Sequence, residues 1–593
     1  MDMPLRTVGH SSRRGLVRYG AWVLAMVLSS HASAQSSGSW PLHGHDLGGQ
    51  RYSALTAIDT TTVTRLVPKW TYHSGVTATF QSTPIVVDGV MYVSLPFSGV
   101  AALDATSGRE LWKYQHASRS EKLCCGPANR GVAVAGGKVY LGTVDGRLVA
   151  LDAKTGATLW DVAVADYQGA TEAVTQLKQD SLSRLSTIGT TGVGVAAAPL
   201  VYDGKVFVGI AGVGYGLHLA HGQAVGLAVI GVAGEYGRPG LMAAFDAETG
   251  RPIWRFDITG PGWEGTFSSA TPDGVPLHRD LAAERTEAAK YPDAWRYGGG
   301  SVYTTPVVDA GRHLLIFGTG NPSPQMADES RPGDNLYTTS LVALDLRTGK
   351  LVWYYQQVPH DRWGYDVANS PILLDLKYDG KRVPAVAQAG KTGWVYVHDR
   401  RDGRLLFKSD AFVPQRNLFA PPQPGEGVVV APGAGGGAGW SPSAYDGSRQ
   451  MFFVSALHLP MRYVVHEERR SDGSVVRYTS TQNTDEAGGT LTALDLGAGG
   501  RLRWQVTTDE PLIGGVLATA GGLVFSGMGG GVFAAFDAGS GKQLWSYQCA
   551  AGVNAPPITY EVDGSQYVAV AVGGNAMFGF KEGDMVVAFG LPE

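Results

Sequence analysis

The chain has few cysteines and little charge for its size. Its 593 residues include only 3 cysteines, and charged residues make up 17% of them. No Cys-x-x-Cys-His sequence occurs, so the chain encodes no covalently attached c-type haem. The formal net charge is -4, and a chain without a basic excess is a poor candidate for binding nucleic acid.

An apolar run near the N-terminus has the pattern of an export signal. Arg13, Arg14 and Arg18 precede the run AWVLAMVLSS, and small residues lead to Ala34. The run is too short to span a bilayer comfortably, which favours cleavage over anchoring. We therefore expect residues 1–34 to be a signal peptide for a secretory or a twin-arginine route. The mature chain, 35–593, is then periplasmic, without a transmembrane anchor, in a compartment where disulfides persist.

Glycine is abundant, with 82 residues. One sequence motif, called the recurring phrase below, repeats along the chain. The phrase has an apolar pair, an aspartate, a glycine a few residues later and then an aromatic residue. It predicts a strand, a tight turn carried by Asp and Gly, and a second strand whose aromatic residue packs between neighbouring sheets. A second hairpin precedes most copies, which gives the four strands of a propeller blade. The copies end at Trp112, Trp160, Trp254, Trp353, Phe407, Trp504 and Trp545.

The two ends of the mature chain supply the halves of one further unit. The sequence MVVAFG near the C-terminus is a first half, and RLVPKW, which ends at Trp70, is a second half. Pairing them closes an eighth blade and leaves no open edge strand. We predict an all-β fold, a single eight-bladed β-propeller domain whose last blade joins N- and C-terminal strands. A β-solenoid and two stacked sandwiches are the alternatives, and the split unit argues against both.

Two cysteines stand side by side at Cys124 and Cys125, within CCGPANRG. A disulfide between adjacent cysteines is a poor structural cross-link because it closes a small, strained ring. Together with FGTGNPSP, VPHDRWGYD, GKTGWVYVHDR and the recurring phrase, this sequence resembles the dehydrogenases that carry pyrroloquinoline quinone (PQQ), of the alcohol dehydrogenase type. The resemblance covers nearly the whole mature chain.

The resemblance implies a PQQ site. In that family the paired cysteines form a disulfide ring against one face of the quinone, and two free buried thiols are the alternative here. Lys391 matches a cation that contacts the reactive carbonyl oxygens of the quinone, where a positive charge stabilises developing oxyanion character. The residues that match cofactor contacts of the family are Gln81, Cys124, Cys125, Arg130, Tyr303, Lys391 and Trp440.

The family also holds a hard cation, calcium or a lanthanide, with oxygen ligands against the quinone. Glu235 and Asn321 match two recurrent ligand positions. Asp366 matches a carboxylate that ligates the metal in lanthanide-using members. The resemblance therefore implies a metal site at these three residues.

Several positions depart from the family pattern. Gln81 stands where many relatives have a Glu, and Ala196 stands where a hydroxyl is common. Gly439 replaces an amide-bearing residue. Tyr303 stands where a Trp usually stacks on the cofactor, and a Tyr can still stack.

The most consequential departure is Gly364, at the position where many relatives carry the aspartate that acts as catalytic base. Three interpretations stay open at this point. Asp366 takes over proton abstraction; or Asp366 is a metal ligand while Asp361 or another group is the base; or the chemistry is impaired.

The implied function is oxidation of an alcohol to an aldehyde or ketone by hydride transfer to PQQ, with Asp366 and Lys391 as candidate catalytic residues. Because no haem is encoded, electrons must leave to a separate acceptor such as a cytochrome c or the membrane quinone pool. A non-catalytic propeller scaffold that binds proteins is one alternative, although it would not be expected to keep the site sequences together. An enzyme with altered chemistry on a bulky secondary alcohol is another, compatible with the apolar insertion at 209–234.

Overall fold

The protein is almost entirely β-structure. The structure, a computed structural model, describes residues 38–118, 127–165, 193–211, 230–232, 237–469, 473 and 475–592. All of these lie in one compact unit, Ser37–Glu593. Within the described ranges the one α-helix is α2 (Leu281–Ala288), and no helix there is long and apolar enough to cross a membrane.

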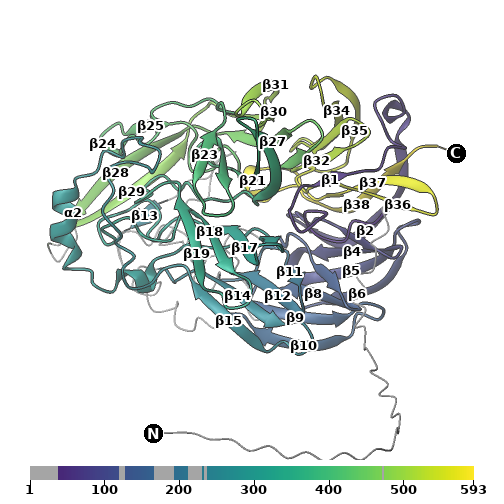
Figure 1. Ribbon diagram of the computed structural model, residues 1–593, viewed down its shortest axis with the longest axis horizontal. Coiled ribbons are helices and arrows are strands. Elements are labelled where there is room, and N and C mark those ends of the chain that lie inside the picture. The colour runs from purple at the N-terminus through teal and green to yellow at the C-terminus, as the bar shows by residue number, and fades with distance from the viewer. Residues whose placement is uncertain are drawn as a thin grey trace, which may run out of the picture. The chain divides into compact units, whose positions relative to one another are not determined.

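Seven copies of the recurring phrase each supply the last two strands of an antiparallel sheet, and the sheets follow one another in chain order (Figure 1). The first three sheets are β3 (Ile85–Val87), β4 (Val90–Leu95), β5 (Gly99–Asp104) and β6 (Glu110–Gln115); β7 (Ala133–Ala135), β8 (Lys138–Gly142), β9 (Arg147–Asp152) and β10 (Thr158–Ala163); and β11 (Leu200–Tyr202), β12 (Lys205–Gly209), β14 (Leu241–Asp246) and β15 (Pro252–Asp257). The next two are β16 (Val307–Asp309), β17 (Leu314–Gly318), β18 (Ser340–Asp345) and β19 (Leu351–Gln356); and β20 (Ile372–Tyr378), β21 (Lys381–Ala389), β22 (Val395–Asp399) and β23 (Leu405–Lys408). The sixth and seventh are β26 (Ala444–Asp446), β27 (Met451–His458), β30 (Gly488–Asp495) and β31 (Arg501–Thr508); and β32 (Val516–Thr519), β33 (Leu523–Gly527), β34 (Val532–Asp537) and β35 (Gln543–Gln548), with β1 (Tyr52–Ser53) parallel to β32.

A further sheet joins the two ends of the described chain. Strand β2 (Val67–Ala78) pairs with β38 (Gly583–Gly590), followed by β37 (Ser565–Val572) and β36 (Ile558–Val562). A separate sheet contains β13 (Ile230–Val232), β29 (Val475–Asn483), β28 (Met461–Arg469), β24 (Gln423–Pro424) and β25 (Val428–Val430), and Figure 1 places it beside α2.

The turn of each phrase is built as the sequence predicts. In the first copy, Asp104 Oδ1 accepts hydrogen bonds from the backbone N of Thr106 at 3.1 Å and of Ser107 at 3.0 Å. Gly108 follows with a φ of +72°. An aspartate that bonds to the backbone ahead of it, followed by a glycine with positive φ, stabilises a tight turn.

In six of the seven turns the glycine lies against the tryptophan of the preceding sheet, and in the sixth copy Gly500 lies against Phe407. A Cβ atom on Gly108 would lie 2.5 Å from Cε3 of Trp70, and Trp70 Nε1 donates to the carbonyl of Ala105 at 3.2 Å. Trp545, in the last copy, donates to the carbonyl of Leu66 at 3.2 Å. As predicted, the aromatic residue of the phrase packs between neighbouring sheets. The same glycine contact recurs for Gly156 with Trp112, Gly250 with Trp160, Gly349 with Trp254, Gly403 with Trp353 and Gly541 with Trp504.

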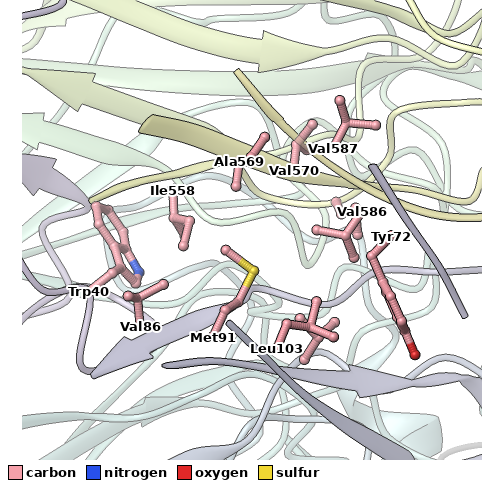
Figure 2. Close-up of a cluster of buried hydrophobic side chains, with 14 of the residues drawn as sticks. Trp40, Tyr72, Val86, Met91, Leu103, Ile558, Ala569, Val570, Val586 and Val587 are labelled. Carbon is pink, nitrogen blue, oxygen red and sulfur yellow. The ribbon is translucent and has the colours of Figure 1, made fainter. Parts of the chain in front are cut away.

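Buried hydrophobic clusters join consecutive sheets. Figure 2 shows one of them, in which Met91 and Leu103 of the first sheet meet Val570 and Val586 of the sheet that joins the two ends. Other clusters join the sheets of β7 and β11, of β11 and β16, of β16 and β20, of β20 and β26, and of β26 and β32. The core is therefore a series of layers between sheets.

The segment 38–53 hydrogen-bonds to the edge strands that lie opposite the tryptophan-bearing strands. Its backbone carbonyls accept from the amides of Val86, Val308, Leu373, Tyr445, Ala518 and Glu561. Arg51 is fully buried in this segment, and its guanidinium donates to the carbonyls of Val516, His43 and Pro557. Burial lowers the pKa of Arg51 to about 9. One side chain thereby ties the segment to two of the sheets.

We expect Arg51→Ala to lower the free energy of unfolding by roughly 2–4 kcal/mol, because the substitution leaves three buried carbonyls without their charged donor. Urea unfolding of the purified chain measures this, with the exposed Arg65→Ala as the matched control. Equal midpoints and slopes for the two variants would contradict the role given to Arg51.

Candidate active site

Four polar or aromatic residues occupy equivalent positions in the loops that lead into edge strands. Gln81 precedes β3, Tyr303 precedes β16, Trp440 precedes β26 and Asn554 precedes β36, each by four residues. Arg130 precedes β7 by three. Because the sheets repeat one architecture, these positions bring the side chains to the same end of the stacked sheets.

Arg130, Tyr303 and Trp440 lie in contact with one another, as expected for three residues that match cofactor contacts of the family. Arg130 Nη1 donates to the carbonyl of Tyr303 at 2.9 Å. Its Cζ lies 4.7 Å from the centre of the Trp440 ring and 5.6 Å from that of Tyr303. A guanidinium held between two aromatic rings keeps its charge close to a flat, partly exposed surface.

Asp366 and Lys391 form a buried ion pair, which is the centre of a second group of residues. Lys391 Nζ donates to Asp366 Oδ2 at 2.7 Å, to the carbonyl of Ala434 at 2.8 Å and to that of Gly364 at 3.0 Å. The Tyr303 hydroxyl also donates to Asp366 Oδ2, at 2.9 Å. Tyr303 therefore links the ion pair to Arg130.

Asn321 is the neighbour of Asp366 on the other side. Its backbone N donates to Asp366 Oδ1 at 2.5 Å. A Cβ atom on Gly320 would lie 3.0 Å from the same oxygen, so a small residue is required there. The structure thus brings together two of the three proposed metal ligands. Glu235, the third, lies outside the described residues, within which no group of three or more His, Cys, Asp or Glu is placed to hold a metal.

The loop that carries Asp366 is shaped by Asp361. Its carboxylate accepts from the backbone N of Trp363 at 2.9 Å, of Gly364 at 3.1 Å and of Tyr365 at 2.8 Å. The side chain is fully buried, and this burial raises the pKa of Asp361 to about 6. Both carboxylate oxygens therefore face the backbone of their own loop.

Gly364 has no space for a side chain. Its φ is +84°, and a Cβ atom would lie 2.8 Å from Gln325 Nε2 and 3.2 Å from the Cβ of Ala434. The side chain of Gln325 occupies the volume that a larger residue at 364 would need. A side chain at position 364 would therefore require Gln325 to move.

Several buried polar atoms of these loops have no hydrogen-bond partner among the described residues. They are Gln81 Oε1, Thr83 Oγ1, Gln325 Oε1, Ser370 Oγ and both amide atoms of Asn554. Such atoms are rare in protein interiors and call for a ligand or water. The hydroxyls of Thr83 and Ser370, the amide nitrogen of Asn554 and the Arg130 guanidinium can donate to the oxygens of a flat tricarboxylate, and two aromatic rings lie beside that guanidinium.

Cys124 and Cys125 lie outside the described residues, as does most of the apolar insertion at 209–234. Cys549, the remaining cysteine, is buried and free.

A family model for the β-propeller domain of PQQ-dependent glucose, ethanol and alcohol dehydrogenases matches residues 40–418 and 492–568. The quinoprotein alcohol dehydrogenase PedH of Pseudomonas putida is 31% identical and covers 98% of each chain. The quinoprotein ethanol dehydrogenase of Pseudomonas aeruginosa is 33% identical, over 92% of this chain and 87% of its own. A europium-containing methanol dehydrogenase superposes with a TM-score of 0.75 at 28% identity, over 94% of this chain and 98% of its own.

The chain belongs to the PQQ-dependent alcohol dehydrogenase family. It is a quinoprotein that oxidises alcohols, as predicted from the sequence, and the predicted all-β propeller class is confirmed. An alcohol substrate and an external electron acceptor follow from this activity. The comparisons favour the enzyme over the scaffold that the sequence analysis kept as an alternative.

Sequence reasoning did not single out Asn554 and Gln325, whose buried amide atoms lack hydrogen-bond partners within the described residues. Asn554 carried a usable signal, because it stands at the same distance before its strand as Gln81, Tyr303 and Trp440. Gln325 carried none, since its role depends on the absent side chain at Gly364 and on the conformation of both loops.

A titration of free thiols determines whether Cys124 and Cys125 are oxidised to a disulfide. If Cys124 and Cys125 form the disulfide, the unreduced enzyme in guanidinium should titrate with one thiol per chain, from Cys549. The native enzyme should titrate with almost none, because burial raises the pKa of Cys549 to about 12. Three thiols in the denatured, unreduced chain would contradict the disulfide.

A second prediction concerns the crowding at Gly364. Gly364→Ala should lower the free energy of unfolding more than Gly380→Ala, which we expect to cost about 1 kcal/mol. Both glycines have positive φ, +84° and +71°, but no atom lies within 4 Å of a Cβ at Gly380. The difference in unfolding free energy measures the displacement of Gln325. Equal losses would show that the space beside Gly364 is open.

Proposed function

We propose that this quinoprotein is a periplasmic alcohol dehydrogenase in which Asp366 takes the proton of the substrate hydroxyl. Asp361 is less suited to the task because it is fully buried and both of its carboxylate oxygens face the backbone of their own loop, whereas Asp366 retains some exposure. Asp366 is the other carboxylate of the loop, and it lies beside Lys391 and Tyr303. The observation that carries the proposal is this buried carboxylate, whose Oδ2 accepts hydrogen bonds from Lys391 and Tyr303.

The residues around Asp366 orient its carboxylate and bind the cofactor. When bound, PQQ supplies a two-electron carbon centre that accepts the hydride lost by the alcohol. Lys391 holds a positive charge next to Asp366 and orients its carboxylate through Oδ2. Arg130, between Tyr303 and Trp440, offers a fixed cation for a cofactor carboxylate.

A metal fits the same place. Asn321, Asp366 and Glu235 supply oxygen ligands of the kind that calcium and the lanthanides prefer. Two of these residues are neighbours, because the backbone N of Asn321 donates to Asp366 Oδ1. The similarity to a europium-containing methanol dehydrogenase makes a lanthanide the first cation to test.

We also propose that the sheets form an eight-bladed ring closed by the pairing of β2 with β38. The hydrogen bond from Trp545 to Leu66 supports this closure, because it repeats, between the two ends of the chain, the contact that joins the other sheets. A cytochrome c or the membrane quinone pool would accept the electrons.

The decisive variant is Asp366→Asn in the enzyme reconstituted with PQQ and either Ca²⁺ or La³⁺. If Asp366 takes the proton, kcat should fall by about 10²-fold or more, and saturating metal should not restore it. Exposed Asp375→Asn on β20 is the matched control. A dye-linked assay over a metal titration gives kcat, and fluorescence titration gives the PQQ affinity.

Recovery of kcat at high metal concentration would assign Asp366 to the metal alone. Failure of the wild-type chain to bind PQQ with any metal would overturn the proposal.

A further inference from the structure

The loop that carries Asp366 is held from outside by the carboxylate of Asp328, in the connection between β17 and β18. Asp328 Oδ2 lies 3.0 Å from Nε2 of His360 and accepts a hydrogen bond from Nη1 of Arg362 at 3.4 Å. These two residues flank Asp361, whose carboxylate binds the backbone amides of the same loop. One carboxylate oxygen therefore contacts both neighbours of the residue that shapes the loop.

The imidazole ring of His360 is enclosed and bonded on both sides. Its side chain is 1% exposed. Nδ1 lies 2.7 Å from the carbonyl oxygen of Gly333, and Nε2 faces Asp328. A carbonyl oxygen and an ionised carboxylate can only accept, so both contacts form when each ring nitrogen carries a hydrogen. Burial lowers the pKa of His360, and the hydrogen bond and negative charge of Asp328 oppose this effect. The second contact of the ring therefore depends on Asp328.

The other carboxylate near this ring is engaged elsewhere. Glu284, on α2, has Oε2 at 3.7 Å from Nδ1 of His360. Its two oxygens accept hydrogen bonds from Arg279 at 2.9 and 2.5 Å. Glu284 also faces the ring nitrogen that the carbonyl of Gly333 already occupies, so it does not take the place of Asp328.

The backbone at His360 adopts a conformation that needs support. Its φ is +55°, in the left-handed region that a residue with a side chain rarely adopts. Its amide N donates to the carbonyl of Asp334 at 3.0 Å. Strained residues of this kind persist where the surrounding structure fixes them. This bond and the two ring contacts fix the point at which the chain enters the loop.

Two guanidinium groups fix the next two residues of the loop. Arg362 Nη2 donates to the carbonyl of Leu277 at 3.1 Å. Arg331 donates through Nη2 to the carbonyl of Asp361 at 2.7 Å and through Nε to that of Pro324 at 2.8 Å. The loop is thereby joined to the segment before α2 and to the connection between β17 and β18.

The two ends of the loop are held by different residues. At its far end, Lys391 Nζ donates to the carbonyl of Gly364 and to Oδ2 of Asp366. We propose that Asp328 is a positioning residue, which holds the start of the loop through its two side-chain contacts so that Asp366 meets the substrate hydroxyl. This inference rests on the proposed role of Asp366. A displacement of about 1 Å caused far from the chemistry can lower a rate by about 10²-fold, so loss of this anchor should be measurable in kcat.

The test compares two neighbouring carboxylates in the enzyme loaded with PQQ and metal. Asp328→Ala removes both contacts and should lower kcat, counted per bound PQQ, by about 10-fold or more. Glu329→Ala is the matched control, because Glu329 is 29% exposed and pairs at 3.1 Å with Arg477, outside the loop. It should leave kcat unchanged. The PQQ affinity, from fluorescence titration, should stay close to that of the wild type in both variants.

Hydrogen exchange of the loaded enzyme reports on the loop without turnover. The backbone amides of 363–365, which bind Asp361, should exchange faster in Asp328→Ala than in the wild type or in Glu329→Ala. If Asp328→Ala does not fold, Asp328→Asn, which removes the charge, is measured instead.

Equal kcat values for the Asp328 and Glu329 variants, or unchanged exchange at 363–365, would overturn the inference. A lower free energy of unfolding with kcat per bound PQQ unchanged would show a structural role only and would overturn it too. In the Asp366→Asn enzyme, adding Asp328→Ala should lower kcat by less than about 2-fold, because the effect passes through Asp366. A full second loss would place the action of Asp328 elsewhere. Wild-type kcat in Asp366→Asn would instead contradict the proposed role of Asp366, whatever Asp328→Ala shows.

Discussion

The contact between a turn glycine and the tryptophan of the preceding sheet is the constraint on which the rest of this molecule depends. At Gly108 and its counterparts a Cβ atom would overlap the indole ring, so glycine alone lets one sheet approach the next closely. The indole nitrogen of Trp70 adds a hydrogen bond to the neighbouring turn. Repetition of this contact sets one spacing between sheets, and the buried valine, leucine and alanine side chains fill the layers. The loops before the edge strands then come to the same end of every sheet.

The site residues on these loops form two groups. Arg130 and Trp440 belong to the first, Asp366 and Lys391 belong to the second, and Tyr303 contacts both. Its carbonyl accepts from Arg130 and its hydroxyl donates to Asp366, so one residue joins the cation between the aromatic rings to the buried ion pair. Lys391 closes the second group with three hydrogen bonds, one of them to the carbonyl of Gly364. Displacement of any member changes the others, because the polar atoms at this depth have few alternative partners.

Much of the architecture could be read from the sequence because it repeats. The Asp and Gly of each phrase specify a turn, and the halves near Trp70 and the C-terminus point to pairing of the two ends, which β2 and β38 do make. The identities of Arg130, Lys391, Asn321 and Asp366 followed from resemblance to a family. Gln325 could not be found in this way, because its position results from the positive φ of Gly364 and from the anchoring of two loops by Arg331. Such contacts depend on tertiary packing, which residue identity alone does not reveal.

The most direct test of the account is a crystal structure of the enzyme loaded with PQQ and La³⁺. The account predicts PQQ between the Arg130 group and the ion pair, the metal coordinated by Asn321, Glu235 and Asp366, and Asp366 still within hydrogen-bonding distance of Lys391. It would be contradicted by a metal or cofactor bound away from Asp366, with the hydrogen bonds of Asp366 to Lys391 and Tyr303 broken.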